Sequence, residues 1–281
     1  MEEIRRVAAV NDLSGFGRCS LTVTIPILSA MGFQVCPVPT AVLSSHTGYP
    51  NPLIRDFTAD MEGYLEHWES LGLTFACGYT GFLGNEKQAE VLEPFLKRLK
   101  DQGALRLVDP AMADHGKLYS SCSPKLIPAM ARLVSLASVA TPNLTELCLL
   151  TGSDYTAAVT SVDLHHEVER MARQLLADGC GALVVTGVEN GDNIDNCVLT
   201  GGDAPAVWVS GHRVAQNFAG TGDVFASVLC GWLLRGVDLP LAVEKTAAFV
   251  CKTTGMTATM HVNGQDGIAF EPFLGELCQG V

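Results

Sequence analysis

Short apolar runs alternate along this chain with longer segments of helical period, and this alternation constrains the fold more than any other sequence feature. The runs are rich in valine and alanine, which is typical of parallel strands buried on both faces. Strands are expected at residues 6–10, 34–38, 73–77, 105–108, 138–141 and 183–186. Helices are expected at residues 21–31, 60–71, 86–101, 124–136 and 163–178. This order predicts an α/β fold with a mostly parallel central sheet.

The pattern changes after residue 186, where the apolar runs become shorter and are interrupted by polar residues. Strands are expected at residues 197–200, 206–209 and 213–216, antiparallel and at one edge of the sheet. Two helices follow, at residues 223–235 and 241–255. Because no repeat, low-complexity segment or linker interrupts the sequence, residues 1–281 are expected to form a single domain.

Composition excludes several classes of protein. Hydrophobic residues make up 48% of the chain and charged residues 17%, so the chain has enough apolar content to fold. The net charge of −12 argues against a nucleic-acid partner. No continuous apolar span long enough for a membrane helix and no export signal is apparent, and the ten cysteines lack metal or redox spacing. A cytoplasmic protein with reduced thiols is therefore expected.

A glycine-bracketed turn, Gly220-Thr221-Gly222-Asp223, opens directly into an apolar helix. The glycines let backbone N–H groups face one point, and the helix dipole adds positive potential there, so the turn is a candidate anion hole. A carboxylate beside such a site could take a proton from an attacking hydroxyl. Capping of the helix by Asp223 is the alternative, since aspartate is a favoured N-cap residue.

Polar residues also follow several expected strands, where doubly wound sheets bind their ligands. Asp109, Glu146 and the pair Thr186-Gly187 are examples. The two carboxylates suit Mg²⁺, which keeps several waters and needs few protein ligands. The alternatives are a turn at Asp109 and a capping arrangement over residues 141–146.

Two familiar nucleotide motifs are not supported. A dinucleotide fingerprint at Gly15 and Gly17 would need its third glycine where Ser20 stands. The one Gly-Lys pair, at residues 116–117, is followed by leucine rather than serine or threonine, which excludes a P-loop there. His46 is a lone histidine and is expected to be a hydrogen-bonded structural residue.

Taken together, these motifs resemble the pyridoxal kinase family of the ribokinase-like superfamily. The resemblance runs from residue 7 to about residue 257 and is carried by Ser-Ser-His-Thr-Gly-Tyr at 44–49, Cys-Gly-Tyr at 77–79, Val-Asp-Pro at 108–110, Thr-Pro-Asn-x-x-Glu at 141–146 and Gly-Thr-Gly-Asp at 220–223. It implies a three-layer α/β/α fold, a homodimer, and adenine bound near the C-terminal helices.

The resemblance also implies roles for individual residues. Asp223 would be the catalytic base, and Gly220, Thr221 and Gly222 would form the anion hole for the transferred phosphoryl group. ATP and Mg²⁺ would be bound by Asp109, Asp114, Thr141, Asn143, Glu146, Thr186 and Gly187, with Asp109 and Glu146 acting on the metal through water. The substrate would contact Asp12, Thr47 and Tyr79. Whether a monovalent cation is also needed stays open.

The implied reaction is ATP-dependent phosphorylation of the 5′-hydroxymethyl group of pyridoxal, pyridoxamine or pyridoxine, in vitamin B6 salvage. Asp12 departs from the pattern, because pyridoxal kinases carry a serine there that touches the ring nitrogen, so the preferred vitamer stays open. Two alternatives remain: a hydroxymethylpyrimidine kinase of thiamine synthesis, whose substrate has a similar shape, and a non-catalytic protein that binds B6 vitamers. An intact Asp223 argues against the second, because a pure binder gains nothing from a base.

Overall fold

A mostly parallel sheet runs through the molecule, whose computed structural model describes residues 5–201, 204–260 and 262–278. Within these residues the sheet has nine strands, in the order β11-β10-β9-β8-β5-β4-β1-β2-β3. The strands are β1 (Arg6–Ser14), β2 (Gln34–Leu43), β3 (Ile54–Asp56), β4 (Cys77–Thr80), β5 (Leu105–Val108), β8 (Val139–Ala140), β9 (Ala182–Asn190), β10 (Asn193–Thr200) and β11 (Val207–His212). The six neighbouring strands β2, β1, β4, β5, β8 and β9 pair in parallel. Strand β3 at one edge of the sheet and strands β10 and β11 at the other pair antiparallel.

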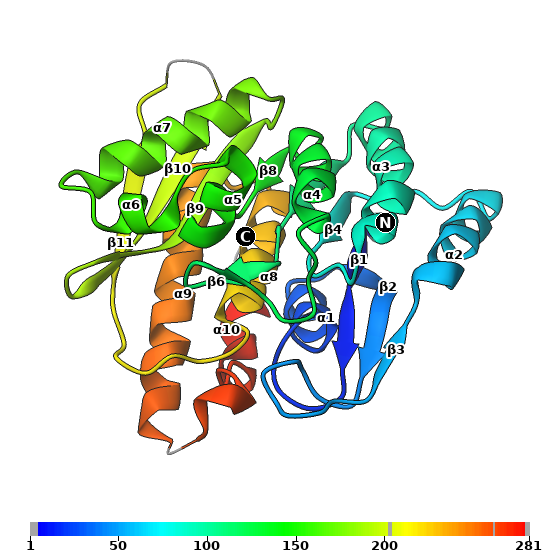
Figure 1. Cartoon of the computed structure of the whole chain (residues 1–281). Coiled ribbons are helices and arrows are strands. Elements are labelled where there is room, and N and C mark those ends of the chain that lie inside the picture. The colour runs from blue at the N-terminus through cyan, green and yellow to red at the C-terminus, as the bar shows by residue number, and fades with distance from the viewer. Residues whose placement is uncertain (1–4, 202–203, 261, 279–281) are drawn as a thin grey trace.

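Helices cover both faces of this sheet (Figure 1). One layer contains α2 (Thr58–Ser70), α3 (Glu86–Asp101), α4 (Leu126–Ser135), α5 (Leu144–Thr151), α6 (Tyr155–Val159) and α7 (Leu164–Ala177). The other contains α1 (Leu21–Ala30), α8 (Thr221–Leu234), α9 (Leu239–Thr259) and α10 (Leu274–Cys278). A small hairpin of β6 (Ala113–Asp114) and β7 (Lys117–Leu118) and two short 3₁₀ turns, η1 (Gly264–Asp266) and η2 (Glu271–Phe273), complete the described structure.

Each central strand contributes side chains to two separate cores. In β9, Leu183 and Val185 belong to the core that includes residues of α3, α4, α5 and α7, whereas Val184 belongs to the core that includes residues of α1, α8 and α9. Because neighbouring residues of a strand point to opposite faces, both sets must be apolar when helices cover both faces. This explains why the strands appear in the sequence as continuous apolar runs.

The expected order of elements is confirmed, and the strand at residues 105–108 and the helix at 86–101 have the expected bounds. The strand expected at 73–77 is instead β4, which begins at Cys77. Gly78 weakens the strand pattern, because glycine is unfavourable inside a strand. A Cβ at this position would lie 2.4 Å from Cδ1 of Leu99 on α3, so glycine leaves room for that side chain.

Two further differences bear on function. The strand expected at 213–216 is wrong: β11 ends at His212 and the chain leaves the sheet there. Helix α5 and the β6–β7 hairpin were not among the expected elements. All ten cysteines are free thiols. Within the described ranges, no helix combines the length and apolar character needed to cross a membrane.

Candidate active site

A cavity of about 670 Å³ lies at the carboxyl ends of the parallel strands. Open α/β sheets bind ligands at this edge, because the loops that leave parallel strands converge there. With one exception, Tyr79, every site residue inferred from the sequence lines this cavity. Residues more than 200 positions apart, such as Asp12 and Asp223, are thereby brought to one place.

The glycine turn forms the start of α8. Gly220 has a positive φ of 72° and stands at the N-cap position, where no side chain caps the helix. A Cβ on Gly220 would lie 1.9 Å from the carbonyl oxygen of Arg18, so only glycine fits. The first N–H groups of a helix have no intrahelical partner, and the helix dipole favours negative charge beside them. The start of α8 can therefore bind an anion, as expected.

Asp223 lies in the first turn of α8 and is not its cap, so the capping alternative is wrong. Its Oδ1 accepts a hydrogen bond of 3.3 Å from Nδ2 of Asn11 on β1. Burial and, to a lesser extent, the nearby charge of Asp12 raise the pKa of Asp223 to about 6, against the lowering effects of the Ser20 backbone and Asn11. A carboxylate with a pKa just below neutrality is well matched to accept a proton at physiological pH.

Asp12 is buried beside Asp223 and lines the cavity. Its Oδ2 accepts a hydrogen bond of 2.7 Å from Oγ of Ser14, and its Oδ1 accepts one from Oγ of Ser20. Burial raises the pKa of Asp12, and the two hydroxyl groups oppose that shift. Each oxygen keeps a second lone pair, so the carboxylate remains able to accept a hydrogen bond from a ligand.

The contacts of Glu146 confirm the capping arrangement that was the alternative for residues 141–146. Its Oε2 accepts from the backbone N–H of Asn143 at 3.0 Å, and Asn143 caps α5 in return, which is a complete capping box. Its Oε1 accepts from the N–H groups of Met112 at 3.0 Å and Ala113 at 3.4 Å. Burial raises the pKa of Glu146 to about 8. With both oxygens held by backbone donors, Glu146 can act on a metal only at a distance, for example through water.

Asp109 follows β5 and is 8% exposed. Burial and then the carboxylates of Glu146 and Asp223 raise the pKa of Asp109 well above its ordinary value. The hydroxyl of Thr141, which also lines the cavity, opposes this rise in the pKa of Asp109. A cluster of buried carboxyl groups beside a cavity fits a hydrated divalent cation such as Mg²⁺. The described residues contain no group of three metal-ligating side chains, so protein ligands alone would not complete its coordination.

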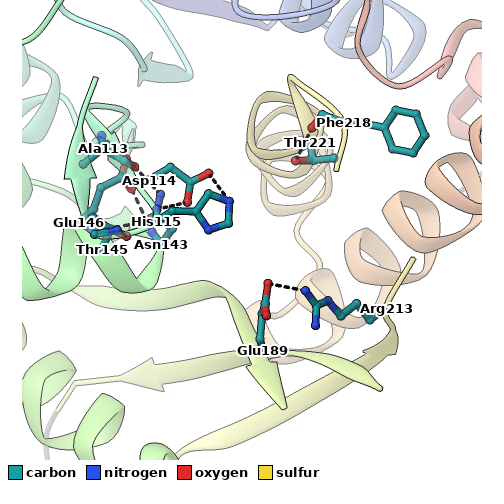
Figure 2. A network of polar contacts seen from close by, with 11 residues as sticks. Ala113, Asp114, His115, Asn143, Thr145, Glu146, Glu189, Arg213, Phe218 and Thr221 are labelled. Atoms are coloured by element: carbon teal, nitrogen blue, oxygen red, sulfur yellow. Dashed lines mark hydrogen bonds and ion pairs between the residues drawn. The ribbon is translucent and has the colours of Figure 1, made fainter. Parts of the chain in front are cut away.

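The β6–β7 hairpin lies over the start of α5 and carries Asp114 at the rim of the cavity (Figure 2). Oδ1 of Asp114 accepts from the N–H of His115 at 2.8 Å. Nδ2 of Asn143 donates to the carbonyl oxygen of Ala113 at 2.8 Å, which ties the hairpin to the helix. Asn143 is therefore occupied with positioning this hairpin. Asp114 is left exposed to the cavity.

Comparison with known proteins assigns the chain to a family. The sequence profile of the phosphomethylpyrimidine kinase family matches residues 72–267. A pyridoxine/pyridoxal/pyridoxamine kinase from Bordetella avium is 32% identical over 268 residues, which cover 89% of this chain and 85% of that protein. This chain belongs to the phosphomethylpyrimidine kinase family.

Solved structures of the family agree with this assignment. A candidate phosphomethylpyrimidine kinase from Bacteroides thetaiotaomicron, in a crystal form with pyridoxal, is 35% identical, with a TM-score of 0.93 and coverage of 99% of this chain and 97% of that one. Pyridoxal kinase from Lactobacillus plantarum is 28% identical, with a TM-score of 0.87 and coverage of 98% and 97%. The resemblance to pyridoxal kinases and the three-layer ribokinase-like fold are confirmed.

Tyr79 lies elsewhere than the family resemblance implies. It is 1% exposed, does not line the cavity and packs in the core beside α8. Burial, followed by the carboxylates of Asp109 and Asp223, raises its pKa well above the ordinary value. The hydroxyl is therefore a neutral donor below the cavity floor. Thr47, in contrast, lines the cavity as expected, and so do Thr186 and Gly187, although these two lie within β9 rather than after it.

The loop of residues 44–49, here called the histidine loop, is held by the C-terminal turn η1. Nδ1 of His46 accepts from the N–H of Gly48 at 3.0 Å, so Nε2 carries the proton and donates to the carbonyl oxygen of Gln265 at 2.7 Å. The hydroxyl of Tyr49 donates to Asp266. His46 is thus a hydrogen-bonded structural residue, as expected, and the role of η1 was missed because these contacts span more than 200 positions.

Sequence reasoning also missed an ion pair at the cavity. Nη2 of Arg213 lies 3.0 Å from Oε1 of Glu189, and both residues line the cavity. Arg213 falls in the segment that was expected to be a strand. No local pattern in the sequence links Arg213 to Glu189, because the contact depends on the course of the chain after β11.

Proposed function

We propose that this member of the phosphomethylpyrimidine kinase family transfers a phosphoryl group from ATP to the 5′-hydroxymethyl group of pyridoxal, pyridoxamine or pyridoxine. The observation that carries the proposal is Asp223, whose pKa is raised to about 6, in the first turn of an uncapped helix that opens onto a 670 Å³ cavity. A base and an anion site therefore lie side by side. The similarity to pyridoxine/pyridoxal/pyridoxamine kinases supports the substrate class.

The reaction steps follow from the residues around α8. Asp223 accepts the proton of the hydroxymethyl group as its oxygen attacks the γ-phosphorus. The backbone N–H groups of Gly220, Thr221 and Gly222 stabilise the negative charge on the transferred phosphoryl group, which must be spread over its oxygens in the transition state. Because these groups are fixed by the helix, little reorganisation is needed when the charge develops.

Substrate contacts are assigned to the other end of the same cavity. Asp12 and Thr47 line it, Asp12 lies near Asp223, and its carboxylate carries a lone pair for a ring N–H or a hydroxyl. A carboxylate would form a stronger, charge-assisted bond to a protonated pyridine nitrogen than a serine would. Tyr79 does not line the cavity, so this proposal assigns it no contact with the substrate.

Mg²⁺ is proposed as the metal, bound by Asp109 and Glu146 through water. It would neutralise charge on the phosphates when bound. The raised pKa values of Asp109 and Glu146 support this assignment, because a divalent cation would relieve the repulsion between the two carboxylates. Asp114, Thr141, Thr186 and Gly187 complete the proposed path of the phosphates.

The adenine end of the nucleotide is proposed to lie against α9. Val214, Ala247, Val250 and Thr254 line that part of the cavity and offer an apolar surface suited to a flat base. The continuous nine-stranded sheet supports one kinase domain over residues 1–281. A homodimer is proposed from the family resemblance alone.

The test is product analysis by mass spectrometry after incubation with Mg-ATP and, separately, pyridoxal, pyridoxamine, pyridoxine, hydroxymethylpyrimidine and ribose. Phosphorylated B6 vitamers are expected. Product from the pyrimidine alone would move the protein to thiamine synthesis. Absence of any product, together with tight vitamer binding, would make it a binding protein.

A further inference from the structure

The proposed nucleotide cavity is rich in acidic side chains and poor in basic ones. Six acidic residues line it: Asp12, Asp109, Asp114, Glu146, Glu189 and Asp223. Among the described lining residues, one lysine or arginine side chain opposes them, that of Arg213. A nucleotide triphosphate carries several negative charges, so the fixed cation in this cavity bears directly on whether it can bind.

Arg213 is placed to reach such a ligand. It directly follows β11, and its backbone N–H donates to the carbonyl oxygen of Asp192 at 2.9 Å, which fixes its position beside the β9–β10 turn. Its guanidinium lies opposite the hairpin of Asp114 and His115 and below the start of α8 that carries Thr221 (Figure 2). The ion pair with Glu189 holds it at this edge of the cavity.

The ion pair itself is easily exchanged. The side chain of Arg213 is 38% exposed and that of Glu189 is 48% exposed, so water screens their attraction and little stability depends on it. A phosphate group offers the guanidinium two oxygens and a larger charge than one carboxylate does. Glu189, once released, can be solvated where it stands.

We propose that Arg213 binds the phosphates of the nucleotide and that Glu189 is its competing partner in the empty site. The inference rests on the proposed use of ATP and deepens it by naming the cation. Glu189 then weakens nucleotide binding by two routes, because it holds the guanidinium and adds a negative charge beside the phosphates. The two members of the ion pair consequently have opposite effects on affinity.

The experiment is calorimetric titration of ADP, with Mg²⁺ present, into the wild-type chain and the variants Arg213→Gln, Arg213→Lys and Glu189→Gln. We expect Arg213→Gln to weaken ADP binding about tenfold or more, which is about 1.4 kcal/mol. Arg213→Lys should weaken it less, because the charge is kept and the two-pronged geometry is lost. Glu189→Gln should tighten binding several-fold. Pyridoxal binding should change in none of them.

The opposite signs separate this role from a structural one. If the ion pair only braced β9 against the segment after β11, both neutral variants would weaken binding together, and that result would overturn the inference. Arg170→Gln is the matched control, because it breaks a 3.0 Å ion pair with Glu167 outside the cavity and should leave ADP binding unchanged.

Failure of this inference is distinct from failure of the proposed function. A wild-type chain that phosphorylates pyridoxal while Arg213→Gln binds ADP normally would overturn the role of Arg213 and leave the kinase intact. A wild-type chain that binds no ADP would overturn both.

Discussion

Nδ2 of Asn11 lies 3.3 Å from Oδ1 of Asp223, so the first strand of the sheet orients the carboxylate at the start of α8. The two residues are 212 positions apart. This hydrogen bond favours the ionised carboxylate, whereas burial and the charge of Asp12 favour the protonated one. The balance keeps Asp223 ionised at neutral pH and still basic enough to accept a proton.

Replacement of Asp223 by alanine is predicted to abolish turnover while nucleotide binding persists. The base acts only in the transition state, so kcat should fall about 10²–10⁴-fold and the dissociation constant of ADP should change little. Steady-state kinetics and calorimetry on the same preparation measure both. Asp101→Asn, on the last residue of α3, is the control. Turnover of Asp223→Ala at the wild-type rate would remove Asp223 from its role as base.

The pH dependence should follow the same carboxylate. Since the base must be ionised, kcat/KM for the vitamer should fall as the pH drops through about 6 and level off above it. Asn11→Ala removes a hydrogen bond that favours the ionised form, so the midpoint should move upward. A midpoint near the ordinary value of an aspartate, unaffected by Asn11→Ala, would contradict the role of burial.

The contribution of Asp223 to the free energy of unfolding should decrease as the pH rises, whereas kcat/KM should increase. The folded pKa of Asp223 lies above its unfolded value, so the protonated form stabilises the fold at low pH and this contribution is lost as the pH rises through about 6. Asp223→Asn should therefore raise the melting temperature at pH 8 more than at pH 4. A variant that is destabilised equally at both pH values would show that ionisation of Asp223 costs nothing.

Replacement of Glu146 by alanine is predicted to destabilise the fold. Three backbone N–H groups would lose their acceptor, those of Met112, Ala113 and Asn143, and the capping box of α5 would be lost. Loss of a cap together with buried unpaired donors costs about 2 kcal/mol or more. Urea denaturation measures the loss, with exposed Glu62→Ala as control. Unchanged stability would contradict the structural role of Glu146.

Replacement of Asp12 by serine is predicted to change the preference among B6 vitamers more than the KM for ATP. The carboxylate lies at the substrate end of the cavity, and a serine cannot form the same charge-assisted bond to a ring N–H. Comparison of kcat/KM for pyridoxal, pyridoxamine and pyridoxine measures the change. Equal effects on every vitamer and on ATP would place Asp12 outside the ring site.

Local patterns predicted most of the fold, because the apolar runs of the strands and the period of the helices are properties of neighbouring residues. The runs at 105–108 and the helix at 86–101 needed no tertiary information. Gly78 could not be interpreted in this way, since its requirement comes from Leu99 on another element. The short helix α5 was likewise not expected, although its capping residues were recognised as a capping arrangement.

The candidate site likewise has residues that local motifs identified and residues whose positions only the structure shows. Motifs identified the glycine turn and the carboxylates that line the cavity, because each is a short run of characteristic residues. The sequence could not reveal that Tyr79 is buried below the cavity or that Arg213 meets Glu189. The burial of Tyr79 depends on which helices cover β4, and the position of Arg213 depends on the course of the backbone after β11.

The contact between the histidine loop and η1 sets the order in which a newly made chain can become active. His46 and Gln265 are 219 positions apart, so the loop leaves the ribosome long before its anchor is translated. The first strands and helices can pair during synthesis, whereas the histidine loop gains its fixed shape only when the segment of η1 arrives. A product of premature termination that retains most of the sheet therefore lacks the anchor of the histidine loop.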